Sequence, residues 1–298
     1  MDNKKEKYLT YINEKFSKIK IDSIHYNFQD GLNNDIVIIN NSEVFRFAKN
    51  HDITDSLEHE IKIINISKEY VDIPLPDLEY IEPGIAKSNF FHGTPIFRNE
   101  LLMLDDEQQN DLAKQIGCFL KQLHSIPMEI IKENEIKAFP GNGVRESFIS
   151  QFHIIEEKLF PMMKSYTKEH ITQIYKPLIE DEKFLLYEST LIHGDLAPFH
   201  FFYSKDENKI NGVIDFGSSG YGDPAHDVAV ILDNFGEGFI KKMSMYYPEI
   251  KLFIDRSRFY ATISSLWWAL RGLENNDLSW HLLHLHTARD IMPIGLKL

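Results

Sequence analysis

Two short segments carry side chains whose types and spacing could do chemistry. They are 193–200, which reads HGDLAPFH, and 212–217, which reads GVIDFG. A carboxylate or an imidazole beside apolar runs costs free energy unless it is paired or binds a ligand. A polar turn between two strands is the alternative interpretation. However, neither Asp195 nor Asp215 is well explained as a core residue, since Asp215 lies between Val-Ile and Phe.

The residues between these segments predict a β-hairpin, with turn residues 204–208 between two apolar arms. A hairpin would bring His200, at the start of one arm, close to Asp215, at the end of the other. Asp195 would lie in the loop just before. This arrangement suits phosphoryl transfer. One carboxylate positions or deprotonates the attacking hydroxyl, and the other, with a ligand five residues after the first, holds magnesium against nucleotide phosphates.

The composition limits the partners that can be expected. The chain has 298 residues with a net charge of −13, which disfavours nucleic acid and favours a cationic small molecule. A lone cysteine, Cys118, excludes a disulfide framework, so we expect a cytoplasmic protein. No apolar run approaches the roughly 18 residues of a membrane span. We therefore expect no membrane or nucleic-acid partner. We also expect a monomer, although the sequence leaves the oligomeric state open.

The first hundred residues predict a β-rich region. Apolar residues recur at helical spacing in the first segment, whereas short β-type runs are separated by turn residues. The expected helices are 3–19 and 55–67, and the expected strands are 23–28, 35–40, 43–48, an edge strand within 73–81, and a strand and turn over 84–97.

The rest of the chain predicts helices with one β-type region, 190–217, which carries the candidate chemistry. The fold class is therefore α+β, with a small β-rich lobe over 1–92, a hinge near 84–94 and a larger, mainly helical lobe over 93–298. The expected helices of the second lobe are 107–124, 144–163, 167–181, 224–234, 237–246, 251–273 and 279–289.

The two segments resemble a known family. HGDLAPFH is similar to the catalytic loop, and VIDFGSSGYGDPAHDVA to the metal-binding segment, of the aminoglycoside phosphotransferases. These are small-molecule kinases with a protein-kinase-like two-lobed fold, and macrolide phosphotransferases are close relatives. The resemblance extends from Gly31 to about Glu274. It implies an N-terminal nucleotide-binding lobe, a C-terminal catalytic and substrate-binding lobe, ATP or GTP as donor, Mg²⁺, and a cationic antibiotic as acceptor.

The resemblance also implies roles for the residues of the two segments. Asp195 would be the catalytic base and Asp215 the principal magnesium ligand. His200 stands where kinases commonly carry asparagine, as a second ligand. An imidazole can bind a metal only when it is neutral, and magnesium prefers oxygen. His193 and Asp227 would order the catalytic loop.

The nucleotide site shows two departures from the family pattern. Arg46, in EVFRFAK, stands where a phosphate-binding lysine is usual, and Glu60 is its expected partner. A guanidinium can still grip phosphate, and Lys49 is the alternative cation. Otherwise Arg46 would be a surface cation in a screened ion pair. The phosphate loop has only Gly31 in place of a Gly-rich sequence. The further nucleotide-binding residues expected are Asn33, Asn34, Ser88 and Phe90.

Acceptor-binding residues are expected after the metal-binding segment. In relatives, acidic residues at this place bind substrate ammonium groups, which suggests Asp233 and Glu237 here; solvated charge is the alternative interpretation. The segment SSLWWALRGLENND lies where the cleft of the family is usually walled. It contributes Trp268, Arg271 and Glu274.

Four functions are compatible with these residues. The first is transfer of the γ-phosphate to an aminoglycoside hydroxyl, conferring resistance. The second is a macrolide phosphotransferase, the third a kinase for choline, a sugar or a similar metabolite, and the fourth a nucleotide-binding pseudokinase. A pocket lined with carboxylates would favour the first, and an apolar cavity the second. Retention of Asp195 and Asp215 argues against the pseudokinase, because pure binding needs no base.

Overall fold

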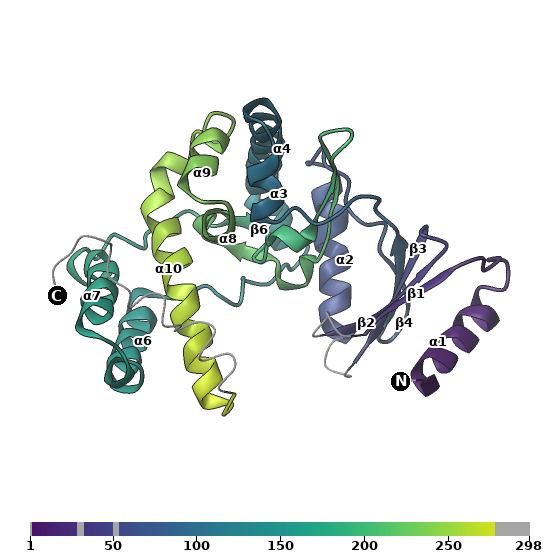
Figure 1. Ribbon diagram of the computed structural model, residues 1–298, viewed down its shortest axis with the longest axis horizontal. Coiled ribbons are helices and arrows are strands. Elements are labelled where there is room, and N and C mark those ends of the chain that lie inside the picture. The colour runs from purple at the N-terminus through teal and green to yellow at the C-terminus, as the bar shows by residue number, and fades with distance from the viewer. Residues whose placement is uncertain (1, 29–32, 50–53, 278–298) are drawn as a thin grey trace.

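A computed structural model describes residues 2–28, 33–49 and 54–277 of the chain. The N-terminal part forms a five-stranded antiparallel sheet in the order β1-β2-β3-β5-β4 (Figure 1). Successive side chains of a strand point to opposite faces, and β2 alternates strictly between half-buried and buried positions. The strands are β1 (Ile24–Asn27), β2 (Asn34–Ile39), β3 (Glu43–Ala48), β4 (Glu79–Glu82) and β5 (Ile85–Asn89).

Two helices cover the two faces of this sheet (Figure 1). Helix α1 (Asp2–Lys15) packs on the outer face, where Tyr8 and Ile12 join a cluster with Val37, Ile39, Phe45 and Phe47. Helix α2 (Thr54–Lys68) lies between the sheet and the C-terminal part. Helix α1 ends at Lys15, earlier than the predicted residue 19. The predicted strands and α2 match within a few residues, except that β5 ends at Asn89 within the predicted segment 84–97.

The C-terminal part is mainly helical and shares one large hydrophobic core. Helices α8 and α10 pack against each other, and α4 packs against α9. Its helices are α3 (Arg98–Met103), α4 (Asp106–His124), α5 (Met128–Glu133), α6 (Arg145–Lys158), α7 (Ser165–Glu180), α8 (Ala225–Phe235), α9 (Glu237–Met243) and α10 (Ile250–Glu274), with 3₁₀ turns at Phe160–Met162, Pro198–His200 and Phe216–Ser218.

Two small antiparallel sheets hold the candidate chemistry. Strands β7 (Phe201–Ser204) and β8 (Lys209–Val213) form the predicted hairpin. The sequence did not predict the second pair, β6 (Thr190–Ile192) with β9 (Gly220–Gly222). These strands have three residues each, and two glycines in β9, so they show no period-two pattern. Strand β6 ends directly before His193, and β9 lies within the metal-binding segment, shortly after Gly217.

The α+β class is therefore confirmed: an antiparallel sheet is followed by a mainly helical part. Short helices α3 and α5 were not predicted because one or two turns carry little periodicity. Residues 29–32 of the expected phosphate loop and the helix expected over 279–289 lie outside the described residues. Within the residues described, no helix is both long and apolar enough to cross a membrane.

Candidate active site

The hairpin brings His200 and Asp215 together, as the sequence predicted. Their side chains meet with His200 Nε2 at 3.3 Å from Asp215 Oδ2. The Ile214 N–H donates to the His200 carbonyl, which extends the ladder past the strands. On the other ring nitrogen, His200 Nδ1 lies 2.7 Å from the Asp195 carbonyl and donates to it. The imidazole therefore links the catalytic segment to the metal-binding segment.

The surroundings lower the pKa of Asp215 and raise the pKa values of His200 and Asp195. Asp215 has left-handed backbone geometry with φ of 68°, and its side chain is 51% exposed. Partial burial opposes its ionisation, but the His200 hydrogen bond and the charge of Arg46 hold the pKa of Asp215 well below its usual range. Burial opposes protonation of His200, yet Asp215 outweighs it and raises the pKa of the imidazole. Burial raises the pKa of Asp195.

His193 fixes the backbone beside Asp195. Its ring is buried, and burial lowers its pKa, so the imidazole is neutral at pH 7. Nε2 donates to the Ile214 carbonyl at 3.0 Å, and Nδ1 accepts from the Asp195 N–H at 3.3 Å. These two bonds define one tautomer and connect the catalytic loop directly to the end of β8.

Asp227 lies beneath the same loop and is fully buried. Its carboxylate accepts hydrogen bonds from the backbone N–H groups of His193 and Gly194, both at 2.8 Å, and from His124 Nε2 at 3.0 Å. His124 in turn accepts from the Tyr247 hydroxyl at 3.0 Å. Burial opposes the charge, but these donors lower the pKa of Asp227 overall. The carboxylate thus holds the turn that precedes Asp195.

Gly194 is the one position in this turn that tolerates no side chain. Its φ is +80°, and a Cβ would lie 2.6 Å from the Phe139 ring and 2.9 Å from the Ser218 carbonyl. Glycine adopts this left-handed region without steric cost. The close approach lets the turn lie flat against the metal-binding segment.

Arg46 and Glu60 form an ion pair at the boundary of the two parts. Both guanidinium–carboxylate distances are 2.9 Å, and the Glu60 side chain is almost fully buried. A Cβ on Gly217 would lie 3.4 Å from Asp215 Oδ1 and 3.9 Å from Glu60 Oε2. The pair therefore lies beside the metal-binding segment. Burial disfavours the cation, yet Glu60 and Asp215 raise the pKa of Arg46.

Lys49 lies at another place, on the end of the sheet. Its Nζ donates to the Phe28 carbonyl at 3.0 Å and is 3.7 Å from Asp35. Asn33 and Asn34 are nearby, because the Asn33 carbonyl accepts from the Lys49 N–H and Asn34 opens β2. These residues adjoin the expected phosphate loop but do not join the Arg46–Glu60 pair.

The two residues expected at the hinge, Ser88 and Phe90, lie on and directly after β5, an inner strand of the sheet. Ser88 is buried in β5, with Val44 as its register partner. The Phe90 N–H donates to the Ser42 carbonyl at 2.9 Å, so this backbone donor is already engaged.

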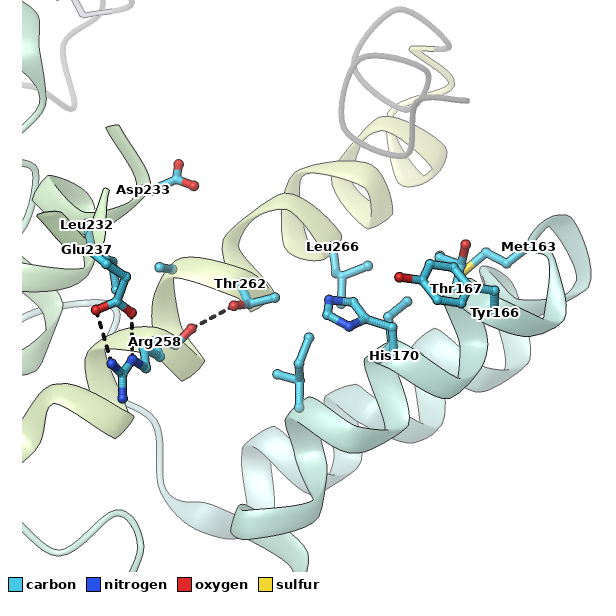
Figure 2. A pocket seen from close by; sticks show the side chains of 13 residues that line it. Met163, Tyr166, Thr167, His170, Leu232, Asp233, Glu237, Arg258, Thr262 and Leu266 are labelled. Carbon is cyan, nitrogen blue, oxygen red and sulfur yellow. Dashed lines mark hydrogen bonds and ion pairs between the residues drawn. The ribbon is translucent and has the colours of Figure 1, made fainter. Parts of the chain in front are cut away.

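A cavity of about 510 Å³ lies between α7, α8 and α10 (Figure 2). Two of the predicted acceptor-binding residues, Asp233 and Glu237, line it. The side chains that line it are Met163, Tyr166, Thr167, His170, Ile171, Ile174, Leu232, Asp233, Glu237, Arg258, Ala261, Thr262 and Leu266.

The other three predicted acceptor residues do not line this cavity. The Arg271 guanidinium lies 4.5 Å from the centre of the Trp267 ring, and Glu274 pairs with Lys158 on α6 at 3.9 Å. Trp268 packs edge-to-face against Trp267, with ring centres 5.4 Å apart. All three are on the last turns of α10, beyond Leu266, where the helix has passed the cavity.

Sequence reasoning missed several residues near these sites. The α7 side chains His170 and Thr167 and the α10 side chain Arg258 line the cavity. Polar residues at three- and four-residue steps, such as Arg258 and Thr262, could have indicated a polar face on α10. His59 was also missed. Its Nε2 donates to the Ser219 carbonyl at 3.3 Å, and no sequence pattern marks this contact.

The donor set near Asp215 fits a magnesium ion shared with a ligand. Among the residues described, no group of three or more His, Cys, Asp or Glu side chains could hold a metal by itself. Magnesium commonly takes only one or two carboxylates and completes its shell with water and substrate phosphates. Half-exposed Asp215 and the tethered His200 ring match that pattern. Because Asp215 favours the protonated imidazole, His200 would have to release its Nε2 proton before that nitrogen could bind a metal.

Comparisons with known proteins agree with this architecture. The chain is similar to aminoglycoside 2′-phosphotransferase-IIIa in its GDP complex (TM-score 0.82, 23% identity, 93% of this chain and 95% of the other). It is also similar to the macrolide 2′-phosphotransferase MphH from Brachybacterium faecium (TM-score 0.73, 16% identity, 97% and 99%). These likenesses confirm the kinase-like fold.

Two sequence comparisons add to the structural ones. The uncharacterized protein YcbJ of Bacillus subtilis (strain 168) is 19% identical over 213 residues, which span 69% of this chain and 67% of that protein. The sequence model described as "Phosphotransferase enzyme family" matches residues 89–247, more than half of the chain and both candidate segments. The predicted family resemblance is confirmed, and the chain belongs to this phosphotransferase family.

Proposed function

We propose that the protein transfers the γ-phosphate of ATP or GTP to a hydroxyl of a cationic antibiotic. The observation that carries this proposal is the convergence of Asp195, His200 and Asp215 at the mouth of one hairpin. The Arg46–Glu60 pair, beside the same segment, supports a nucleotide site at the boundary of the two parts. A protein that only binds nucleotide would need no base, so the pseudokinase is disfavoured.

Asp195 is the proposed proton acceptor. As the acceptor oxygen bonds to the γ-phosphorus, its proton moves to the Asp195 carboxylate, and the bond to the β-phosphate oxygen breaks to release the nucleoside diphosphate. The raised pKa of Asp195 makes this carboxylate a stronger base than an exposed one. The loop that Asp227 and His193 hold keeps the carboxylate in place.

Asp215 and His200 are the residues that would hold magnesium. When bound, the ion neutralises charge on the triphosphate. The tether from His200 Nδ1 to the Asp195 carbonyl presents Nε2 to the metal site. Arg46 contributes positive charge toward the phosphates, and Glu60 holds its guanidinium in one orientation.

An aminoglycoside is the first candidate acceptor, with antibiotic resistance as the outcome. One similar solved structure is the GDP and kanamycin complex of APH(2")-IIIa (TM-score 0.81, 23% identity, 95% of this chain and 97% of that one). In this protein Asp233 and Glu237 line the cavity. Asp233 lies six residues after Asp227 on α8, which is about 9 Å along the helix. Helix α8 therefore carries both a residue that holds the catalytic loop and a residue that lines the cavity.

A macrolide is the second candidate, favoured by the lining of the cavity. Six of the 13 described side chains that line it are aliphatic or thioether. Such a surface matches a largely apolar acceptor better than a polyamine.

A substrate panel tests the proposal. Purified protein is incubated with Mg²⁺ and kanamycin-type, gentamicin-type or macrolide compounds, each with ATP and with GTP, and product mass reports phosphate addition. Asp195→Ala serves as the inactive control. Expression in a susceptible bacterium should raise the inhibitory concentration of the same compound. If no compound gains mass while nucleotide binding is intact, the antibiotic proposal fails and metabolite hydroxyls become the next panel.

A further inference from the structure

One of the acidic residues that line the cavity, Glu237, already forms an ion pair with another lining residue, Arg258. Arg258 on α10 makes a bidentate ion pair with Glu237, at 2.6 Å from Nε to Oε1 and 3.0 Å from the second nitrogen to Oε2. The same guanidinium donates to Asp255 at 2.8 Å. Figure 2 shows this pair, with Asp233, at one end of the cavity, and Tyr166, Thr167 and His170 at the other.

This pair changes what Glu237 can offer a ligand. Both carboxylate oxygens already accept hydrogen bonds from Arg258, so a ligand ammonium group would have to compete with a guanidinium held in fork geometry. Among the described lining residues, histidine aside, the charged side chains are two carboxylates and one guanidinium, and one of the carboxylates is already paired with that guanidinium.

The remaining lining makes additional cations costly. Apolar side chains from α7, α8 and α10 form much of the wall, including Ile171, Leu232 and Leu266. An ammonium group that loses water against such a wall without a carboxylate partner carries a large desolvation penalty. A polycationic ligand would place some of its amines in this position, whereas an apolar ligand with one amine would not.

We propose that Arg258 is a specificity-determining residue. By occupying Glu237, it restricts the cavity to acceptors with an apolar body and a single cationic group, and loss of its charge shifts preference toward polycations. The inference rests on the proposed function, because it takes the cavity as the acceptor site.

Direct binding tests this without phosphoryl transfer. Isothermal calorimetry, in the absence of nucleotide, measures Kd for kanamycin, a polycation, and for erythromycin, which carries a single tertiary amine. We expect Arg258→Gln to tighten kanamycin binding by about tenfold, the effect of one released charge-assisted hydrogen bond, and to change erythromycin binding far less. Lys251→Gln is the matched control: it removes one positive charge from an exposed position of α10 outside the lining.

Two further variants separate specific pairing from general charge. Arg258→Lys keeps the cation and should keep the native preference, whereas Glu237→Gln removes a carboxylate from the lining and should weaken kanamycin binding. Thermal unfolding of each variant confirms an intact fold. The inference is overturned if Arg258→Gln leaves the ratio of the two dissociation constants unchanged, if Lys251→Gln reproduces the shift, or if no variant binds either compound.

The outcome is distinguishable from failure of the proposed function. A shifted binding ratio without phosphorylation of either compound would keep the role of Arg258 and reject the antibiotic kinase. Phosphorylation of either compound with an unchanged binding ratio would keep the antibiotic kinase and reject the role of Arg258.

Discussion

The position of Asp195 is fixed by hydrogen bonds to its backbone and to the backbone of the two residues before it. The residues before it are held by Asp227 through two backbone N–H groups, and its own N–H is held by His193. The carbonyl of Asp195 accepts from His200. Both sides of the residue are therefore fixed, while burial makes its carboxylate a better base. Precise placement of one carboxylate is the main requirement for proton transfer in this chemistry.

The first prediction concerns this carboxylate. Asp195→Ala should lower kcat by about 10²–10⁴-fold, the usual contribution of a general base, and leave nucleotide affinity near that of the wild type. Rapid-mix turnover assays and nucleotide titration measure the two effects. Asp195→Asn keeps the shape but not the basicity and should be similarly impaired. Turnover near the wild-type rate in either variant would show that the base is elsewhere.

A second prediction concerns Asp215. Replacement by alanine removes the carboxylate expected to hold magnesium and leaves His200 without its ion-pair partner. Magnesium-dependent nucleotide binding should be lost, while binding without magnesium should change little. Equilibrium titration of a fluorescent nucleotide with and without Mg²⁺ measures this. The assignment would be wrong if the magnesium dependence stayed intact.

The sequence predicted some residue positions well and others poorly, for a physical reason. A hairpin forces its two ends together, so the nearness of His200 and Asp215 followed from the turn residues between them. Helical residues have no comparable constraint. Trp268 and Arg271 fall on α10 beyond the cavity, and Arg258, three turns earlier, lines it. Which residues of this 25-residue helix face the cavity depends on the helices packed against it, and the sequence does not show that packing.

At the scale of elements, α2 connects the sheet to the metal-binding segment. It carries Glu60, which holds Arg46, and on the preceding residue His59, which donates to the Ser219 carbonyl. The Ser219 hydroxyl in turn donates to the His193 carbonyl. Two consecutive residues of one helix thus connect Arg46 on the sheet with the loop that carries Asp195.

We therefore predict a positioning role for His59. His59→Ala should raise KM for the nucleotide several-fold and lower kcat modestly, because α2 loses its tie to the segment that carries Asp215. His59→Gln restores an N–H donor and should recover most of the loss. Steady-state kinetics of both variants measure this. Equal impairment in both would indicate simple loss of packing.

Helix α1 depends on a buried carboxylate of β2. Asp35 is fully buried and accepts from the Tyr8 hydroxyl at 2.8 Å and from Lys4 at 2.9 Å. Burial opposes its charge, but these donors lower the pKa of Asp35 overall. A depressed pKa stabilises the fold above the ordinary carboxyl value, and this contribution is lost as the pH falls toward the folded value.

Asp35→Asn should therefore reduce the free energy of unfolding by roughly 1–3 kcal/mol at pH 7. Below about pH 4 the difference from the wild type should shrink, because the Asp35 carboxyl of the unfolded wild-type chain is then increasingly protonated while that of the folded chain stays ionised. Urea unfolding at a series of pH values measures it. A difference that stays constant from pH 7 to pH 3 would contradict an ionised Asp35.

The sequence located most elements and the β7–β8 hairpin, but not the pairing of β6 with β9. Periodicity predicted the N-terminal strands and the long helices because each has enough residues to show a pattern. The β6–β9 pair has three residues per strand, yet it sets the spacing between the catalytic and metal-binding segments. Register between such short strands comes from tertiary packing, here from Gly220, where a Cβ would lie 2.6 Å from the Lys137 carbonyl.

For the whole molecule, the charge of −13 should act on the approach of the acceptor. Long-range attraction raises the association rate of a cation and is screened by salt over about 10 Å at 0.1 M ionic strength. The Glu237–Arg258 pair acts only at short range, inside the cavity. The two effects are therefore separable. The net charge of the protein affects the association rate of the acceptor, and the ion pair affects how tightly the acceptor binds in the cavity.

This separation gives the last prediction. For a cationic acceptor, kcat/KM should fall several-fold as ionic strength rises from about 0.05 to 0.5 M, while kcat changes little, because screening weakens encounter but not the bound chemistry. Arg258→Gln should keep the same salt dependence for a monocationic acceptor, because one charge adds little to the net field. Kinetics at several salt concentrations measure both. A kcat/KM that is independent of salt would mean that local contacts, and not the acidic surface, govern acceptor capture.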